Sequence, residues 1–344
     1  MTASPTATDP APVDVVCLGE SMVALLPAGG GRLADAEAFV RGIGGAESNV
    51  ACALAAAGHR TRWVSRVGAD GFGDHLVAAI AARGVDTSAV VRDPDRPTGV
   101  YLRTAADRAD ADHEVLYYRA GSAASALSHR TVPRAALASG RILHVSGITA
   151  ALSAGCRDLM HRLLAHRPGR GTVSFDVNHR PALWRDADGP EVLLRLARGA
   201  DLVFVGEDEA RTAWGLDTPD AVRAALPEAR LVVVKRGAAG AVAFTGDGDR
   251  VETRAPRVEV VAAVGAGDAF AAGFLSGTLD SVPLRDRLRR GHLFAAAALT
   301  VPGDLAAPPG RQQTERLTAL DDTAWGRLHL GPGWTGRDQE VPTP

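Results

Sequence analysis

The sequence predicts an α/β fold, in which a mainly parallel sheet lies between two layers of helices. From residue 141 onward, short apolar runs alternate with helical stretches, which is typical of parallel strands joined by crossover helices. Residues 97–120 carry a different pattern, that of a tyrosine-rich β-hairpin. A second, smaller sheet is therefore expected beside the main one.

The composition narrows the class of protein. The 344-residue chain has 46% hydrophobic residues, enough for a large core, and its net charge of −2 does not suit a nucleic-acid binder. Cys17, Cys52 and Cys156 are scattered and odd in number, which favours a reducing cytoplasm over disulfides or a zinc site. Residues 1–12 lack the features of a signal peptide and are expected to be a disordered tail, and no apolar run is long enough to cross a membrane.

The first part of the chain is predicted to form strand, helix, strand and helix. Val13–Leu18 is an apolar strand that ends at Gly19-Glu20, and residues 21–43 carry mixed apolar and turn signals. An alanine-rich helix then runs to about Ala57, where Gly58 is suited to close it. Further on, a strand at Trp63–Val67 leads through a glycine-rich turn into a helix at 74–83.

The second part supplies most of the parallel sheet. Buried strands are predicted at 142–146, 173–177, 202–205 and 231–235, and helices at 154–166, 189–198, 207–214 and 219–225. A short helix is expected after residue 311. Residues 326–344 contain Gly, Pro and Trp without a clear period, and we expect a loosely ordered tail there.

The stretch Gly265-Ala266-Gly267-Asp268 precedes an apolar run of small residues that reads as a buried helix. The first backbone N–H groups of a helix lack internal partners, and a glycine-rich turn lets an anion approach them. Asp268 in the first turn is then suited to accept a proton from a hydroxyl that attacks a phosphoryl group. The alternative is a tight turn with Asp268 as a helix cap.

A second glycine-rich turn, Gly44-Gly45-Ala46-Glu47-Ser48-Asn49-Val50, also enters a helix. Glu47 and Asn49 offer polar groups there, and an amide both donates to and accepts from a polyol hydroxyl. Helix capping and close helix packing explain the same pattern equally well.

The hairpin at 97–120 contains all three tyrosines. Alternation places Tyr101 with Arg103 on one face of the first strand and Tyr117 with Arg119 on one face of the second. Such a surface suits a small polar anion, because Arg119 can bind a carboxylate in a bidentate manner. Cross-strand packing of the tyrosines is the alternative.

Polar residues follow the predicted parallel strands, at the edge where open α/β sheets bind ligands. They are Ser146-Gly147, then Asp176, Asn178 and Arg180, then Glu207 and Glu209, then Lys235-Arg236-Gly237. Lys235 either contacts a phosphate or is solvated at the strand end. The chain contains no Gly-x-x-x-x-Gly-Lys-Ser/Thr, which excludes a P-loop.

Together these segments resemble the ribokinase-like (PfkB) carbohydrate kinases, and within them the 2-keto-3-deoxygluconate kinase branch. The two glycine-rich turns resemble the two family signatures. The branch is indicated by the segments at 97–103, 117–123, 146–149, 176–180 and 301–304. This resemblance implies a ribokinase-like three-layer α/β/α sandwich over residues 13–325, with a small β-sheet lid from about 21–43 and 97–120.

The resemblance implies transfer of the γ-phosphate of ATP, with Mg²⁺, to the 6-hydroxyl of 2-keto-3-deoxygluconate. Asp268 would be the general base, and the amides of Gly265, Ala266 and Gly267 the anion hole. The sugar acid would be contacted by Gly45, Ala46, Glu47, Ser48, Asn49, Tyr101, Tyr117, Arg119, Asn178, Arg180 and Asp304. The nucleotide would be contacted by Gly206, Lys235, Arg236, Gly237, Gly240, Gly265, Gly267 and His292. Glu209 would act near Mg²⁺, and the lid would also pair subunits into a homo-oligomer.

Two positions depart from the family pattern. Gly206 stands where an Asn is usual near Mg²⁺, and Ala262 stands where an Asp helps to hold a monovalent cation, so weak or absent potassium activation is expected. Alternatives to the gluconate acid are its galactonate analogue, a neutral ketose or a nucleoside. A non-catalytic sugar-acid sensor is a further alternative, which the intact Asp268 opposes.

Overall fold

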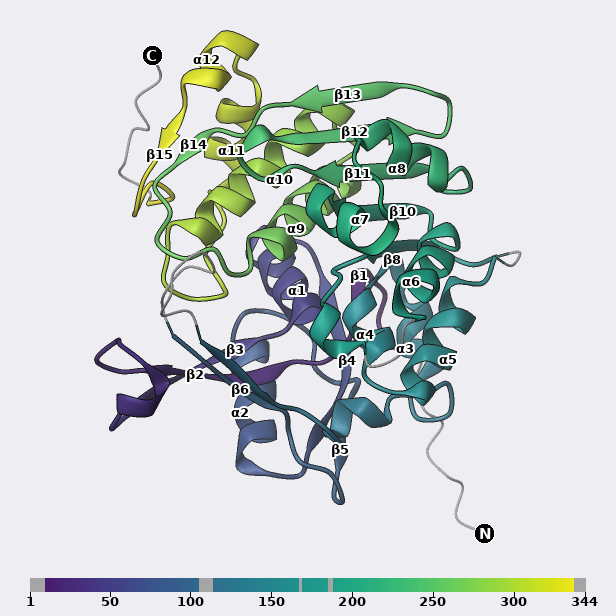
Figure 1. The fold of residues 1–344 in the computed structure, drawn as a ribbon, viewed down its shortest axis with the longest axis vertical. Helices are drawn as coiled ribbons and strands as arrows, with labels where there is room; N and C mark the ends of the chain where they lie inside the picture. Colours follow the sequence, from purple (N-terminus) through teal and green to yellow (C-terminus); the bar gives the residue numbers. More distant parts are fainter. Residues whose placement is uncertain (1–9, 105–113, 167–168, 185–187, 337–344) are drawn as a thin grey trace.

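The main sheet has nine strands in the order β13-β12-β11-β10-β9-β8-β1-β4-β5 (Figure 1). The structure is a computed structural model, and it describes residues 10–104, 114–166, 169–184 and 188–336. The strands are β1 Val13–Leu18, β4 Thr61–Gly68, β5 Val90–Asp93, β8 Gly140–Ser146, β9 Thr172–Asp176, β10 Leu202–Gly206, β11 Leu231–Lys235, β12 Ala241–Thr245 and β13 Arg250–Thr253. Neighbours from β11 through to β5 pair in parallel, whereas β12 and β13 are antiparallel. The predicted, mainly parallel sheet is confirmed.

Helices cover both faces of this sheet, which gives the three expected layers. One face packs against α3 Arg134–Ala138, α4 Gly147–Ala151, α5 Ala154–Leu164, α6 Gly189–Arg198, α7 Glu207–Trp214 and α8 Pro219–Ala225. The other packs against α1 Ala46–Ala56, α2 Gly71–Ala81, α9 Ala266–Leu279 and α10 Leu284–Leu299. Alternation along β1 explains this division, because Val16 and Leu18 enter the first core and Val15 and Cys17 enter the second.

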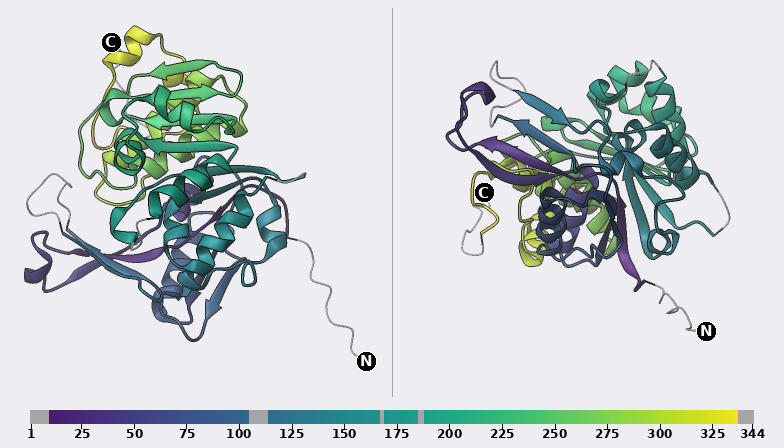
Figure 2. Two further views of the ribbon diagram at one scale, coloured as in Figure 1. Left: turned by 45° about the vertical axis from the view of Figure 1, so that its right-hand side comes forward. Right: turned by 90° about the horizontal axis from the view of Figure 1, so that it is seen from below.

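A small sheet projects from the body, with strand order β3-β2-β6-β7 (Figure 2). Its strands are β2 Met22–Pro27, β3 Phe39–Gly44, β6 Val100–Arg103 and β7 Val115–Tyr118. Tyr101 lies opposite Tyr117, and the two rings stack with their centroids 5.8 Å apart. The predicted polar tip of this hairpin, at 105–113, lies outside the described residues. The small sheet therefore combines the tyrosine hairpin with part of 21–43, as expected.

Helix boundaries differ from the prediction where a polar residue caps the first turn. The helix expected at 74–83 begins at Gly71, because the Asp70 carboxylate accepts a hydrogen bond from the Gly73 amide at 2.8 Å. The one expected at 154–166 ends at Leu164. Short 3₁₀ turns lie at Leu33–Asp35, Ala123–Ala126, Pro181–Leu183 and Gly237–Ala239. None of the helices in the described ranges has both the length and the apolar composition needed to span a bilayer.

The C-terminal region is packed, in contrast to the loosely ordered tail predicted from 326. After α11 Arg311–Thr318 and α12 Asp322–Arg327, strand β15 His329–Leu330 pairs with β14 Arg257–Val258. Leu328, Leu330 and Trp334 are buried in a third core with α10 and α11. These apolar residues are isolated in the sequence and meet in one core, so their spacing has no helical or strand period. Residues 337–344 lie outside the described part.

Candidate active site

The turn before α9 leaves backbone amides available to a ligand. Gly265 is the residue before the helix and has a φ of 73°, a left-handed conformation that favours glycine. No side chain in the described residues caps this helix start. Asp268 instead accepts a hydrogen bond from the Asn49 amide nitrogen at 2.9 Å. The alternative in which Asp268 caps the helix is therefore wrong, and the two glycine-rich turns meet at this contact.

The Asp268 carboxyl lies in an environment suited to proton transfer. Burial raises its pKa to about 7, and the nearby Asp176 acts in the same direction, whereas the bond from Asn49 and the charges of Lys235 and Arg180 oppose the shift. A base whose pKa lies near the working pH is both ionised often enough and basic enough to act. The carboxyl therefore has the properties of a general base at neutral pH.

Lys235 is not solvated at the strand end. Its ammonium group donates to both oxygens of the Asp176 carboxylate, at 2.8 and 3.0 Å, and it lies 3.6 Å from the position that a Cβ on Gly267 would take. This cation thus faces the glycine turn. Asp176, the last residue of β9, was predicted to lie at this edge of the sheet, but no contact with a ligand was assigned to it.

Of the second glycine-rich turn, only Asn49 reaches Asp268 with its side chain. Glu47 is fully buried, and its Oε1 accepts hydrogen bonds from the Ser146 amide, the Ser146 hydroxyl and the Thr149 hydroxyl. The Ser48 hydroxyl lies 3.0 Å from the Ser21 hydroxyl and 3.1 Å from the Gly45 carbonyl oxygen, and it donates its single proton to one of them. Glu47 precedes Asn49 by two residues, about 200° around the helix, so its side chain points into the protein interior and away from Asp268. The expected contact of Glu47 with a substrate does not agree with this orientation.

The small sheet brings Tyr101 and Asp304 together. The Tyr101 hydroxyl donates to Asp304 Oδ2 at 2.5 Å, and the half-exposed Tyr117 ring stacks on Tyr101. Arg119 lies over the Tyr117 ring, but its guanidinium also forms an ion pair with the buried Glu20. Sequence reasoning missed this pairing, although Glu20 stands two residues after the end of β1.

Two buried amide oxygens have no hydrogen-bond partner within the described part of the chain, those of Asn49 and Asn178. Asn178 has a φ of 39°, a conformation that costs a non-glycine residue on the order of 1–3 kcal/mol and is common at ligand sites. Buried acceptors of this kind are normally satisfied, so the two side chains are suited to ligand hydroxyls. Arg180, two residues after Asn178, is half-exposed, and its Nη1 lies 3.5 Å from Glu209 Oε1 in an ion pair.

Of the residues predicted to contact a nucleotide, Gly206, Lys235, Arg236, Gly237 and Gly240 lie at or just after the ends of β10 and β11, Gly265 and Gly267 at the start of α9, and His292 in α10. Glu209 accepts a hydrogen bond from the Gly206 amide at 2.9 Å, and Arg236 pairs with Glu207 and Glu252. Gly237 and Gly240 both have positive φ in the loop that follows β11. His292 is buried and lies 3.1 Å from the Thr253 hydroxyl. Burial lowers the pKa of His292 to about 4, so it is neutral.

The comparisons with known proteins agree with this arrangement. The family model described as "pfkB family carbohydrate kinase" matches residues 13–309. The chain belongs to the PfkB family of carbohydrate kinases. Its membership covers the main sheet, the small sheet, both glycine-rich turns and Asp304.

Relatives of this PfkB family member include two proteins named 2-dehydro-3-deoxygluconokinase. The protein from Bacillus subtilis is 37% identical over 90% of this chain and 97% of its own length. The protein from Thermoproteus tenax is 32% identical over 89% of this chain and 94% of its own length. The crystal structure of a PfkB protein from Polaromonas sp. JS666 is 36% identical, with a TM-score of 0.78 over 90% of this chain and all of that one.

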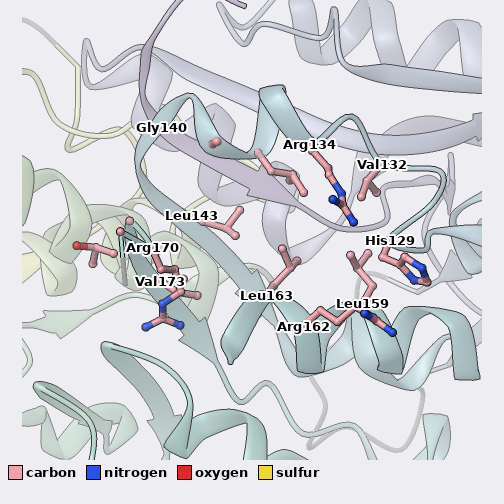
Figure 3. A pocket seen from close by; sticks show the side chains of 15 residues that line it. His129, Val132, Arg134, Gly140, Leu143, Leu159, Arg162, Leu163, Arg170 and Val173 are labelled. Atoms are coloured by element: carbon pink, nitrogen blue, oxygen red, sulfur yellow. The ribbon is translucent and has the colours of Figure 1, made fainter. Parts of the chain in front are cut away.

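A separate groove of about 430 Å³ is not part of this PfkB site (Figure 3). Leu143, Leu159 and Val173 form part of its apolar wall, and Arg134 also lines it. It lies where β8 and β9 begin, whereas Asp176 and Ser146 stand at the opposite, carboxyl ends of these strands. Ligands of open α/β sheets bind at the carboxyl edge, where the residues around Asp268 gather.

The pH dependence of this kinase is expected to report on Asp268. Because a general base must be ionised, and its pKa is raised to about 7, kcat/KM should fall about tenfold per unit of decreasing pH well below that value. The measurement is kcat/KM between pH 5.5 and 8.5. Replacing Asn49 by Leu removes a contact that lowers the Asp268 pKa, so this variant should move the acid limb to higher pH. If the acid limb of this variant stays at the same pH as in the wild type, the titrating group is ATP or another group and not Asp268.

Proposed function

We propose that this protein transfers the γ-phosphoryl group of ATP to the 6-hydroxyl of 2-keto-3-deoxygluconate, the acid also called 2-dehydro-3-deoxygluconate. The observation that carries the proposal is the half-buried Asp268 carboxyl beside the uncapped Gly265 turn, with a pKa of about 7. The names of the two curated relatives support the choice of substrate.

In the proposed step, Asp268 accepts the proton of the 6-hydroxyl as this oxygen bonds to the γ-phosphorus. The bond from that phosphorus to the bridging oxygen breaks, and ADP leaves. The amides of Gly265, Ala266 and Gly267 stabilise the charge on the phosphoryl oxygens, as preorganised donors do. The Lys235 ammonium, close to Gly267, adds positive charge on the same side.

The nucleotide would lie along Gly206, Lys235, Arg236, Gly237, Gly240, Gly265, Gly267 and His292. Mg²⁺ bound to ATP takes most of its ligands from phosphates and water and one or two carboxylates from the protein. The Glu209 carboxylate fits this role, since it is half-buried and held by the Gly206 amide. When bound, the ion neutralises charge on the phosphates.

The sugar acid would contact Gly45, Ala46, Ser48, Asn49, Tyr101, Tyr117, Asn178, Arg180 and Asp304. The unsatisfied amide oxygens of Asn49 and Asn178 suit hydroxyl donors. Arg180 suits the carboxylate better than Arg119, because its ion pair with Glu209 is long, at 3.5 Å, and more exposed, whereas Arg119 pairs closely with the buried Glu20. The small sheet would close over the sugar and keep out water, a competing phosphoryl acceptor.

The small sheet would also pair subunits. Its exposed apolar side chains, Phe39, Val40, Leu116, Tyr117 and Tyr118, support burial against a second copy. The three buried, unpaired cysteines and the use of ATP support a cytoplasmic location.

A second candidate is a kinase of this family that acts on a neutral sugar. The Glu20–Arg119 ion pair favours it, because this pair neutralises one of the two arginines expected to select an acid. The distinction depends on the remaining charge of Arg180.

An assay that couples ADP release to NADH oxidation tests both candidates. The substrates are 2-keto-3-deoxygluconate, its galactonate epimer, fructose and a nucleoside, each at equal concentration. We expect turnover with a keto-deoxy acid and at least tenfold lower kcat/KM with fructose. Turnover of fructose alone would support the second candidate, and a folded protein inactive on all four would refute both.

A further inference from the structure

Arg103 is a buried cation that reaches from the small sheet into the body of the protein. Arg103 is the last residue of β6, and only 2% of its surface is exposed. Its Nη2 donates to Asp304 Oδ1 at 2.9 Å and to the Pro302 carbonyl at 3.2 Å, and its Nη1 donates to the Thr104 carbonyl at 3.3 Å. Arg103 is therefore anchored on both sides of the junction between the small sheet and the loop after α10.

Asp304 is held from two directions by the same strand. Oδ1 accepts from Arg103, and Oδ2 accepts from the Tyr101 hydroxyl at 2.5 Å. The Asp304 side chain is 8% exposed, and the Arg103 guanidinium, 3% exposed, is its counter-charge away from solvent. A carboxylate in this position still has lone pairs for further donors.

The loop that carries Asp304 also packs on the turn before α9. A Cβ added to Gly265 would collide with the Asp304 carbonyl oxygen, and one added to Gly44 would collide with the Tyr101 hydroxyl and with Asp304. A chain of direct contacts thus runs from β6 through Arg103 and Asp304 to Gly265, whose amide turn faces the phosphoryl group in the proposed reaction.

We propose that Arg103 is a positioning residue that fixes Asp304 against the Gly265 turn, so that the small sheet and the anion-binding turn take up their binding geometry together. The expected effect on kinetics rests on the proposed function. The coupling between the small sheet and the Gly265 turn rests only on the contacts described above. Without the guanidinium, Asp304 is a buried carboxylate without a counter-ion, and its side chain turns away from Tyr101 and the Gly265 turn. This change weakens sugar binding while leaving the nucleotide contacts at β10 and β11 intact.

The kinetic test compares Arg103→Met with Arg103→Lys. We expect Arg103→Met to raise KM for the sugar acid at least tenfold and to raise KM for ATP by a smaller factor, because Gly265 is the nucleotide contact that packs against Asp304. Arg103→Lys keeps the charge but not the two-sided contact, and should recover part of the loss. Arg66→Met is the matched control, because Arg66 pairs with the buried Asp93 at 2.7 Å on β4 and β5, within the main sheet. It should leave both KM values within twofold of wild type.

A second measurement does not depend on turnover. Amide hydrogen exchange in the apo protein should become at least fivefold faster in Arg103→Met both at 100–103 and at Ala269, whose amide donates to the Gly265 carbonyl, whereas Arg66→Met should leave Ala269 unchanged. Unchanged exchange at Ala269 in Arg103→Met, or an unchanged KM for the accepted sugar, would overturn the proposal. A wild type that phosphorylates no sugar acid would refute the proposed function instead, and the exchange data would still decide the coupling.

Discussion

Asp268→Asn is expected to lower kcat by about 10²–10⁴-fold, the usual contribution of a positioned general base. The amide has nearly the shape of the carboxylate and can still accept the hydrogen bond from Asn49, so the start of α9 should keep its structure. It cannot take up the proton of the attacking hydroxyl. The measurement is the initial rate at saturating ATP and sugar acid, in the coupled assay described above.

The control for Asp268→Asn is Asp220→Asn, which removes an equal charge from the exposed end of α8 and should leave kcat unchanged. Calorimetry should find that Asp268→Asn still binds the sugar acid, since Asp304 and Arg180 remain. Activity near wild type in Asp268→Asn would mean that another group accepts the proton. Loss of sugar binding as well as rate would mean that Asp268 mainly shapes the pocket.

The sheet was predictable because its strands are buried on both faces. A strand covered by helices on both sides reads as a continuous apolar run, so β1 and β11 were predicted with their observed limits. Several helices, including α6 and α7, were also placed correctly by their apolar period. Errors occurred where a single side chain sets the boundary, as Asp70 does at the start of α2.

The site was predictable only to the level of which residues approach the same edge. Strand polarity and order bring Asp176, Lys235 and Asp268 to the carboxyl ends of the strands. The direction of each side chain and its partner depend on packing between distant parts of the chain. The contacts of Glu47 with Ser146, of Arg119 with Glu20 and of Arg103 with Asp304 each join residues about 100 or more positions apart. No local pattern encodes such pairs.

The C-terminal region shows the same limit, because its apolar residues are isolated in sequence and meet only in space. Trp334 is 3% exposed and packs with Leu317, Trp325 and Leu330, and its carbonyl accepts a hydrogen bond from Gln313 at 2.9 Å. A side chain in a loosely ordered tail would contribute little to the free energy of unfolding. The free energy of unfolding therefore distinguishes the packed region from the predicted tail.

Trp334→Ala is expected to lower the free energy of unfolding by about 3–5 kcal/mol, the range for removing a buried large aromatic side chain. The third core lies on α10, which packs against α9, so the loss should affect the cooperative unfolding of the whole domain. Urea denaturation followed by circular dichroism measures it, with Val260→Ala as the control. Val260 is 53% exposed, and its truncation should change the value by no more than about 0.5 kcal/mol. If the two variants were equally stable, Trp334 would not be part of the core, and the region after α12 would be the loose tail that its sequence indicated.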